Sequence, residues 1–326
     1  MNGFSWKLFF AIFLCPLPVM TATGPVPGGY HVDHGDNAEI DAHGKKKKVT
    51  NNHPSGKTIY VPLNSDLEWS TYIASPPPGV TIEDAGCGTG EPITIFLKSG
   101  SSWVVPDDWC PTANTIHAIG GGGGGDWSNH TRVAGGGGGA YASISNFAAT
   151  PGQVINYQVG AGGAAGAVGQ PGGDTWFHSP ATLLAKGGGG GNHDIGGQGG
   201  SAAESVGEVK FSGGNGGNSP ANNRGGGGGG AAGPNGPGGH GGNGVTSGDG
   251  GGGGGGANGG GNGANATHPN GGAGGKNRFG TGGGAGGTSG GNGGHGSNGG
   301  GGGGAAATAY GGNGSQEDLW TQASNG

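Results

Sequence analysis

The sequence predicts an all-β protein with almost no helix, in which a small β-sandwich carries a long glycine-rich region. Glycine accounts for 95 of the 326 residues, whereas an ordinary protein contains about 7% glycine. Between residues 57 and 186, short runs of alternating apolar and polar residues are separated by turn signals, as in antiparallel sheets. No apolar repeat of about 3.6 residues is sustained anywhere, so no long amphipathic helix is expected.

The first 22 residues are predicted to be an export signal. Lys7 and the amino terminus supply positive charge, Leu8–Met20 is largely apolar, and Ala22 offers a small residue for cleavage. The apolar stretch is too short to cross a bilayer, so we expect no transmembrane span in the mature chain. Translation that begins at Met20 is the alternative. We expect either a secreted, extracellular protein or a component of a virion tail.

Residues 23–56 are predicted to form a flexible polar arm, because they lack apolar periodicity. The histidines and aspartates of His31–Asp36 are of the types that bind zinc or nickel. Without a scaffold to fix their geometry, we favour a solvated arm and predict no metal and no other cofactor. The basic run Lys45–Lys48 is interpreted as a solvated loop, with a nuclear signal or a polyanion-binding patch as the alternative.

Two strand-rich segments precede the glycine-rich region. Residues 57–92 are predicted to be a short strand-rich segment, and residues 93–186 the sandwich domain. In Val154–Val159 the side chains of Ile155, Tyr157 and Val159 share one face, which is the predicted core face. The expected strands are 57–63, 69–74, 80–82, 93–97, 103–105, 115–119, 140–144, 154–159, 175–177 and 183–186, with one more at 206–211 inside the glycine-rich region.

Three cysteines indicate at most one disulfide in the exported chain. Cys15 lies within the export signal, which leaves Cys87 and Cys110. A disulfide between these two suits an oxidising compartment, and two free thiols are the alternative, because spacing does not prove a bridge. The acidic turn Asp107–Trp109 lacks the spaced oxygen ligands of a calcium loop.

Residues 187–314 are predicted to be a low-complexity region, followed by a polar tail at residues 315–326. The region is either disordered or a bundle of polyglycine II helices, which pair their backbone groups laterally without an apolar core. Ordering a residue costs about 1–2 kcal/mol, and a hydrogen bond returns a net ~0.5–1.5 kcal/mol. A bundle would therefore need its ends held by the sandwich.

Strands and glycine blocks follow one another in a specific order within residues 101–187. The motifs are Ser101–Pro106, Thr115–Gly125, Gly135–Tyr141, Thr150–Gln153, Tyr157–Gly163, Gly172–Phe177 and Ala185–Gly187. This order resembles the glycine-rich domain of bacteriophage tail fibres and prophage-like bacterial proteins. A looser likeness to the glycine-rich extracellular domain of anaplastic lymphoma kinase family receptors implies a β-sandwich decorated by polyglycine helices. We expect a jelly-roll or TNF-like sandwich, although the polar tail replaces the apolar strand that usually closes these relatives.

The resemblance implies a structural or host-recognition part of a fibre, without catalytic residues. No nucleophile elbow or metalloprotease motif stands out, so we predict no enzyme. A net charge of −6 provides no electrostatic footprint for nucleic acid. Fibre proteins are often trimers, so a homo-oligomer is compatible with this function.

We expect a non-enzymatic structural or surface-attachment protein. The first alternative is a tail-fibre adhesin that recognises a host surface polysaccharide or an outer-membrane protein. The second is an ice- or matrix-binding polyglycine protein, against which the irregular spacing of Asn, Ala and Thr argues. Isolated aromatic side chains among the glycines either stack on sugar rings or staple loops to the sandwich; these are Trp127, Phe279 and Tyr310.

Overall fold

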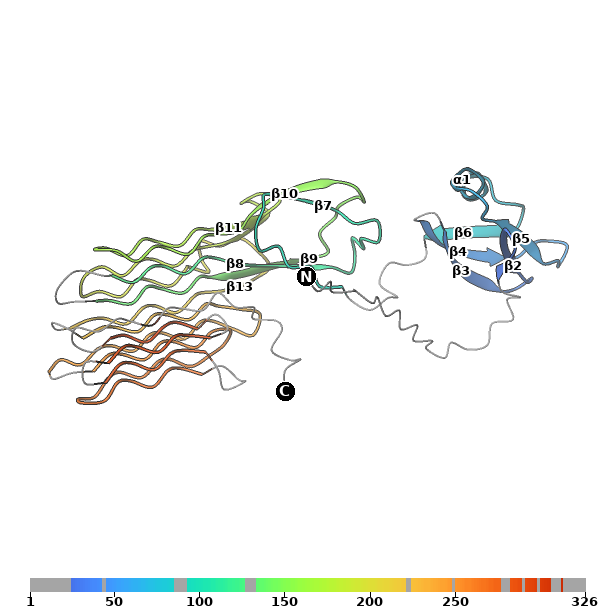
Figure 1. Ribbon diagram of the computed structural model, residues 1–326. Coiled ribbons are helices and arrows are strands. Elements are labelled where there is room, and N and C mark those ends of the chain that lie inside the picture. The colour runs from blue at the N-terminus through green and yellow to red at the C-terminus, as the bar shows by residue number, and fades with distance from the viewer. Residues whose placement is uncertain are drawn as a thin grey trace, which may run out of the picture. The chain divides into compact units, whose positions relative to one another are not determined.

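The chain forms two compact units, Met1–Glu91 and Pro92–Gly326. Several antiparallel sheets and, in the part of the chain that the structure describes, one short helix confirm the all-β prediction (Figure 1). The predicted export signal and polar tail lie outside the described residues. The structure is a computed structural model, and it describes residues 25–42, 45–84, 93–126, 133–220, 224–247, 250–276, 282–288, 291–297, 300–305 and 312.

The first unit consists of two three-stranded antiparallel sheets and a helix around one apolar cluster. The sheet orders are β1-β2-β5 and β3-β4-β6. Val32, Val49, Val61 and Trp69 are fully buried in the cluster. The elements are β1 (Pro25–Val26), β2 (Gly29–Val32), β3 (Asn37–Ala42), β4 (Lys45–Asn51), β5 (Ile59–Pro62), α1 (Asp66–Ala74) and β6 (Val80–Asp84).

Strands β1–β4 occupy the stretch that the sequence predicts to be a flexible arm, residues 23–56, so that prediction is corrected. Its few apolar residues are enough, because they contribute directly to the cluster shared by both sheets. The run Lys45–Lys48 is likewise part of β4 and not a loop. Lys48 pairs in register with Glu39 of β3, and opposite charges across neighbouring strands stabilise a sheet.

The strand predicted at residues 69–74 is wrong, because these residues belong to α1. The hydroxyl of Ser65 accepts a hydrogen bond from the backbone N–H of Glu68 at 3.2 Å, which caps the start of the helix. Ser65 and Glu68 have the spacing of a capping box, a helix signal that alternation of apolar residues does not reveal. The helix presents Trp69 to the apolar cluster.

The Tyr72 hydroxyl is buried and has no hydrogen-bond partner in the described part of the chain. The ring stacks on Trp69 with 6.4 Å between centroids. Burial raises the pKa of Tyr72 to about 12. In the unfolded chain tyrosine ionises near pH ~10, so above that pH the unfolded state loses its proton first. The free energy of unfolding should therefore fall as the pH rises from ~10 toward ~12.

We expect Tyr72→Phe to leave stability at neutral pH unchanged or slightly higher, because removing an unpartnered buried hydroxyl leaves no donor unsatisfied. The substitution should also weaken the alkaline loss of stability. Denaturant unfolding at about pH 7 and about pH 11 measures both effects. A variant that is clearly destabilised at neutral pH would show that the hydroxyl has a stabilising partner.

In the second unit, two antiparallel sheets share one apolar cluster, which is compatible with the predicted small β-sandwich. Their orders are β12-β11-β10-β7 and β13-β9-β8. Ile155 and Tyr157 face the cluster as predicted, whereas Val159 is exposed. The strands are β7 (Ser102–Val104), β8 (Thr115–Ile119), β9 (Tyr141–Ser145), β10 (Val154–Gln158), β11 (Thr175–Phe177), β12 (Leu183–Ala185) and β13 (Val209–Phe211).

One predicted strand of this unit is wrong, and one predicted within the glycine-rich region is present. Residues 93–97 form no strand, and Ile93 is 76% exposed, because an apolar run without a paired neighbour has no ladder to join. Strand β13 lies within the strand predicted at residues 206–211, and it completes the second sheet by pairing with β9. The second sheet therefore draws one strand from the glycine-rich region.

The strands of the sandwich continue directly into glycine-rich segments, which run side by side away from the sheets (Figure 1). At this junction the Thr175 hydroxyl donates to the carbonyl of Ile119 at 2.6 Å and accepts from the N–H of Gly160 at 2.9 Å. We call these segments the glycine lattice; they are residues 120–126, 133–140, 160–173, 187–200, 212–219, 224–232, 237–245, 250–257, 260–266, 271–276, 282–288, 291–297 and 300–305.

Backbone hydrogen bonds between segments hold the glycine lattice together. In its central stretch, Gly251–Gly256, every N–H donates and every C=O accepts, at N···O distances of 2.7–3.0 Å. Gly251 and Gly254 bond to the same two neighbouring segments. Gly252 and Gly255 bond to a second pair of segments, and Gly253 and Gly256 to a third pair. The partners therefore repeat every third residue. The six neighbours are 224–232, 237–245, 260–266, 271–276, 282–288 and 300–305.

Glycine is required at this stretch because the segments approach so closely. A Cβ added at Gly254 would overlap the carbonyl oxygen of Gly301, and one at Gly253 would overlap that of Ala273. All of Gly251–Gly256 is buried. Paired backbone groups thus take the place of an apolar core, and the described segments are ordered, contrary to the alternative of disorder.

Candidate functional site

The histidines and aspartates considered for a metal do not converge. His31 lies edge-on to Tyr60, with ring centroids 5.7 Å apart, and Asp33 accepts a hydrogen bond from the Thr58 hydroxyl at 2.6 Å. Within the described ranges no group of three or more His, Cys, Asp or Glu side chains is placed to hold a metal ion. These residues therefore contribute to the packing of the first unit.

His117 and Tyr141 form a close polar pair beside the junction of sheet and lattice. Nδ1 of His117 lies 2.6 Å from the Tyr141 hydroxyl. Burial lowers the pKa of the histidine and raises that of the tyrosine. Both shifts favour the neutral forms, which suits a hydrogen bond that ties β8 to β9 better than it suits proton transfer near neutral pH.

Only Cys110 among the predicted site residues lies in the described part of the chain. It is buried and disulfide-bonded. Cys87 lies outside the described residues, so its pairing with Cys110 stays a prediction. The aromatic residues predicted to make surface contacts also lie outside the described residues; they are Trp127, Phe279 and Tyr310.

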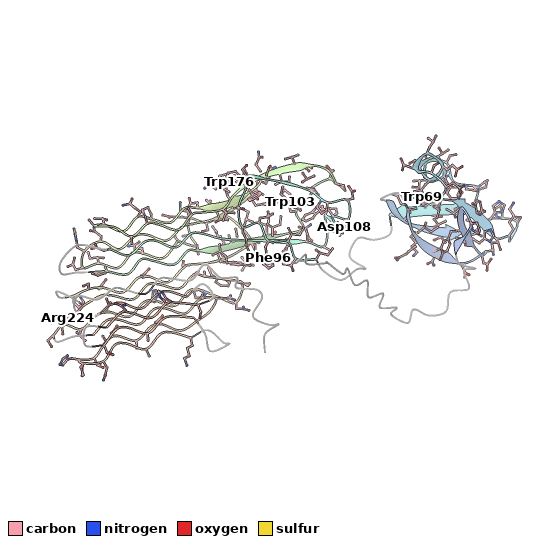
Figure 2. The ribbon with its side chains drawn as sticks, viewed as in Figure 1. Trp69, Phe96, Trp103, Asp108, Trp176 and Arg224 are labelled. Atoms are coloured by element: carbon pink, nitrogen blue, oxygen red, sulfur yellow. The ribbon has the colours of Figure 1, made fainter. Side chains whose placement is uncertain are left out.

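The far end of the glycine lattice is the first candidate surface. Figure 2 shows Arg224 at this end, remote from the sheet residues Trp103 and Trp176. The turn Asn192–Ile195 lies here, because the N–H of Ser219, in the segment leading to Arg224, donates to the carbonyl of Asp194 at 3.0 Å. We call this surface the distal end.

Two exposed apolar side chains and a buried carboxylate lie at the distal end. Asp126 is 2% exposed, and its Oδ2 lies 3.6 Å from Nδ1 of His193. Ile195 is 64% exposed and Val168 43% exposed. A β-bridge between Asp126 and Gly166 places Val168 close to the same point. A contiguous exposed apolar patch rimmed by polar groups is one mark of an interaction surface.

A row of side chains along the outside of the lattice is the second candidate surface. The Oδ1 atom of Asn218 accepts the N–H of Gly196, that of Asn243 accepts the N–H of Asn218, and that of Asn265 accepts the N–H of Asn243. These three donor–acceptor distances lie between 2.7 and 2.9 Å. Each side chain thus satisfies an outward backbone donor of the preceding segment.

A second row runs beside the first, three residues away along each segment. Asn215 accepts from Gly199, His240 accepts through Nδ1 from Asn215, and Asn262 accepts from His240, at 2.8–2.9 Å. The two rows together form what we call the amide face, which consists of Asn215, Asn218, His240, Asn243, Asn262 and Asn265.

The residues of the amide face are regularly spaced in the sequence, which the overall composition does not reveal. Asn215 and Asn218, His240 and Asn243, and Asn262 and Asn265 are each separated by two small residues. The same three-residue spacing governs the backbone contacts of the central stretch. Polar side chains therefore recur where the chain surface faces outward, and glycine where another segment lies against it.

The comparisons with protein families and with curated proteins found no match. No protein-family model and no curated protein matches the chain.

The helix α1 has 9 residues, and nowhere in the described ranges is a helix long and apolar enough to cross a membrane.

Proposed function

We propose that the chain is a non-enzymatic structural or surface-attachment protein, exported or associated with a virion. The observation that carries this proposal is the complete backbone pairing of Gly251–Gly256 with six neighbouring segments. Such a lattice is a stiff support, because backbone hydrogen bonds join its segments side by side and hold the central one from all sides. The support carries the distal end away from the sandwich.

Polyglycine II helices are the conformation that we propose for the lattice segments. The partners repeat every third residue, which matches the three residues per turn of this helix. The central stretch Gly251–Gly256 bonds only to neighbouring segments and not within itself, as the conformation requires. A jelly-roll or TNF-like sandwich at the base is part of the same proposal, and it rests on the resemblance to tail-fibre glycine-rich domains.

The adhesin version of this function is favoured by the distal end. Exposed Ile195 and Val168 lie beside the polar Asp126 and His193 at the end opposite the sheets. An attachment protein presents its contact residues where the support ends, and binding energy concentrates in a few such side chains. The proposed partner is a host surface polysaccharide or an outer-membrane protein.

Binding of the labelled full chain to a panel of bacterial cells tests this function. We expect saturable binding to some of the strains. Replacing both Ile195 and Val168 by serine should lower the affinity about tenfold or more, because truncation of a contact residue costs ~2 kcal/mol or more.

The matched control replaces Val104 and Val154 by serine. These two valines form an exposed cross-strand pair on the sandwich, 58% and 61% exposed, and their replacement should leave binding unchanged. Saturable binding that both double variants retain equally would refute recognition through the distal end. Absence of binding to every strain would refute surface attachment altogether.

A further inference from the structure

The side-chain nitrogens of the amide face are oriented hydrogen-bond donors on residues that are exposed or, at Asn243, half-buried. Each Oδ1 is held by a backbone N–H, which orients the Nδ2 of the same amide away from that contact. In the part of the chain that the structure describes, these nitrogens have no acceptor. The amide face therefore presents donors in two parallel rows with a common orientation.

The last segment of the amide face adds backbone donors to these rows. The N–H groups of Asn262 and Asn265 have no acceptor within the described ranges. They occupy the positions that on the neighbouring segments are capped by the next asparagine or histidine. An acceptor supplied by a ligand would continue the two rows of hydrogen bonds beyond this segment.

The surroundings of the rows restrict the chemistry of such a ligand. The contributing segments 212–219, 237–245 and 260–266 contain no Asp, Glu, Lys or Arg. Only glycine or alanine separates the paired side chains, so no bulky residue stands between the rows. Nucleic acids and other polyanions bind through Lys and Arg, and a protein partner requires apolar or aromatic anchors.

We propose that the amide face binds an extended, uncharged, hydroxyl-rich polysaccharide. This inference rests on the proposed attachment function and names the chemistry of one partner. The hydroxyl and ring oxygens of such a polymer are acceptors that recur along the chain, and they match donors that recur along the lattice. The donors are already oriented by their own hydrogen bonds, so little side-chain entropy is lost on binding.

Replacing asparagine by aspartate separates the binding of a polysaccharide from the structural role of these side chains, which is to accept backbone N–H groups. The triple variant Asn218→Asp, Asn243→Asp and Asn265→Asp keeps an oxygen to accept each backbone N–H, but it removes the donor of one complete row. We expect its unfolding midpoint to fall only slightly, through repulsion between the neighbouring carboxylates. Its affinity for a neutral polysaccharide should fall about tenfold or more, as the loss of several donors at once implies.

The experiment measures sedimentation of the full chain with insoluble α- and β-glucans, mannan, galactan and chitin. A control variant places the same three negative charges on the sandwich (Asn146→Asp, Gln153→Glu and Asn156→Asp), where they should not affect binding. Retained binding in the amide-face variant, or equal loss in both variants, would overturn the proposal. So would binding to dextran sulfate alone.

Failure of this proposal and failure of the attachment function give different results. Wild-type protein that binds cells but none of the neutral polysaccharides overturns the role of the amide face and leaves attachment intact. Protein that binds neither cells nor polysaccharides overturns both.

Discussion

Gly254→Ala is expected to destabilise the second unit by at least about 3 kcal/mol, because overpacking at this site has no route of relief. The added methyl group would overlap the carbonyl oxygen of Gly301. This oxygen belongs to the backbone of a neighbouring segment, so it cannot move aside as the end of a flexible side chain could. Moving that segment away would stretch its hydrogen bonds to Gly255 and Gly284. The thermal unfolding of the full chain measures the effect.

Gly261→Ala is the matched control for this substitution. Gly261 is exposed, and a Cβ there would lie 3.8 Å from its nearest neighbour, the carbonyl oxygen of Lys276. The alanine should be tolerated, or slightly stabilising, since it reduces the freedom of the unfolded chain. Equal stability of the two variants would mean that close approach of segments does not require glycine at position 254.

Trp69→Ala is expected to unfold the first unit while leaving the second unit folded. Trp69 is fully buried, and truncating a buried tryptophan costs about 3–5 kcal/mol. A unit of this size has little stability to spare, since domains provide only ~0.05–0.15 kcal/mol per residue. The second unit has its own apolar cluster and its own lattice, so its unfolding transition should not move.

Calorimetry of the full chain distinguishes the two transitions. Leu67→Ala serves as the control, because Leu67 lies on the same helix and is 77% exposed. It should leave both transitions in place. If Trp69→Ala shifts both transitions together, the two units do not unfold independently.

The strands of the sandwich were predictable because each alternates apolar and polar residues between strong turn signals. The expected strand at residues 115–119 coincides with β8 and that at 175–177 with β11. Alternation of apolar residues gave the wrong prediction at residues 69–74, where a local signal outweighed it. The capping box at Ser65 starts the helix α1, which includes Trp69. Alternation failed again at residues 93–97, where no neighbouring strand pairs with the apolar run.

The order of the glycine lattice could not be decided from the sequence, because its hydrogen bonds join segments that are far apart along the chain. Gly228, for example, donates to Gly302 and accepts from Gly255. The spacing of polar residues looked irregular and argued against a matrix-binding protein. In the structure that spacing becomes the three-residue repeat of the amide face, as at Asn215 and Asn218, so the argument from irregularity no longer holds there.

Amide hydrogen exchange of Gly251–Gly256 tests the central claim most directly. All six N–H groups are buried and bonded to neighbouring segments, so the account predicts that they exchange only when the whole second unit unfolds. Protection should equal that of core residues such as Ile155 and Tyr157 in β10. Exchange as fast as that of an unstructured peptide, with β10 still protected, would contradict the lattice and the functions proposed for its surface.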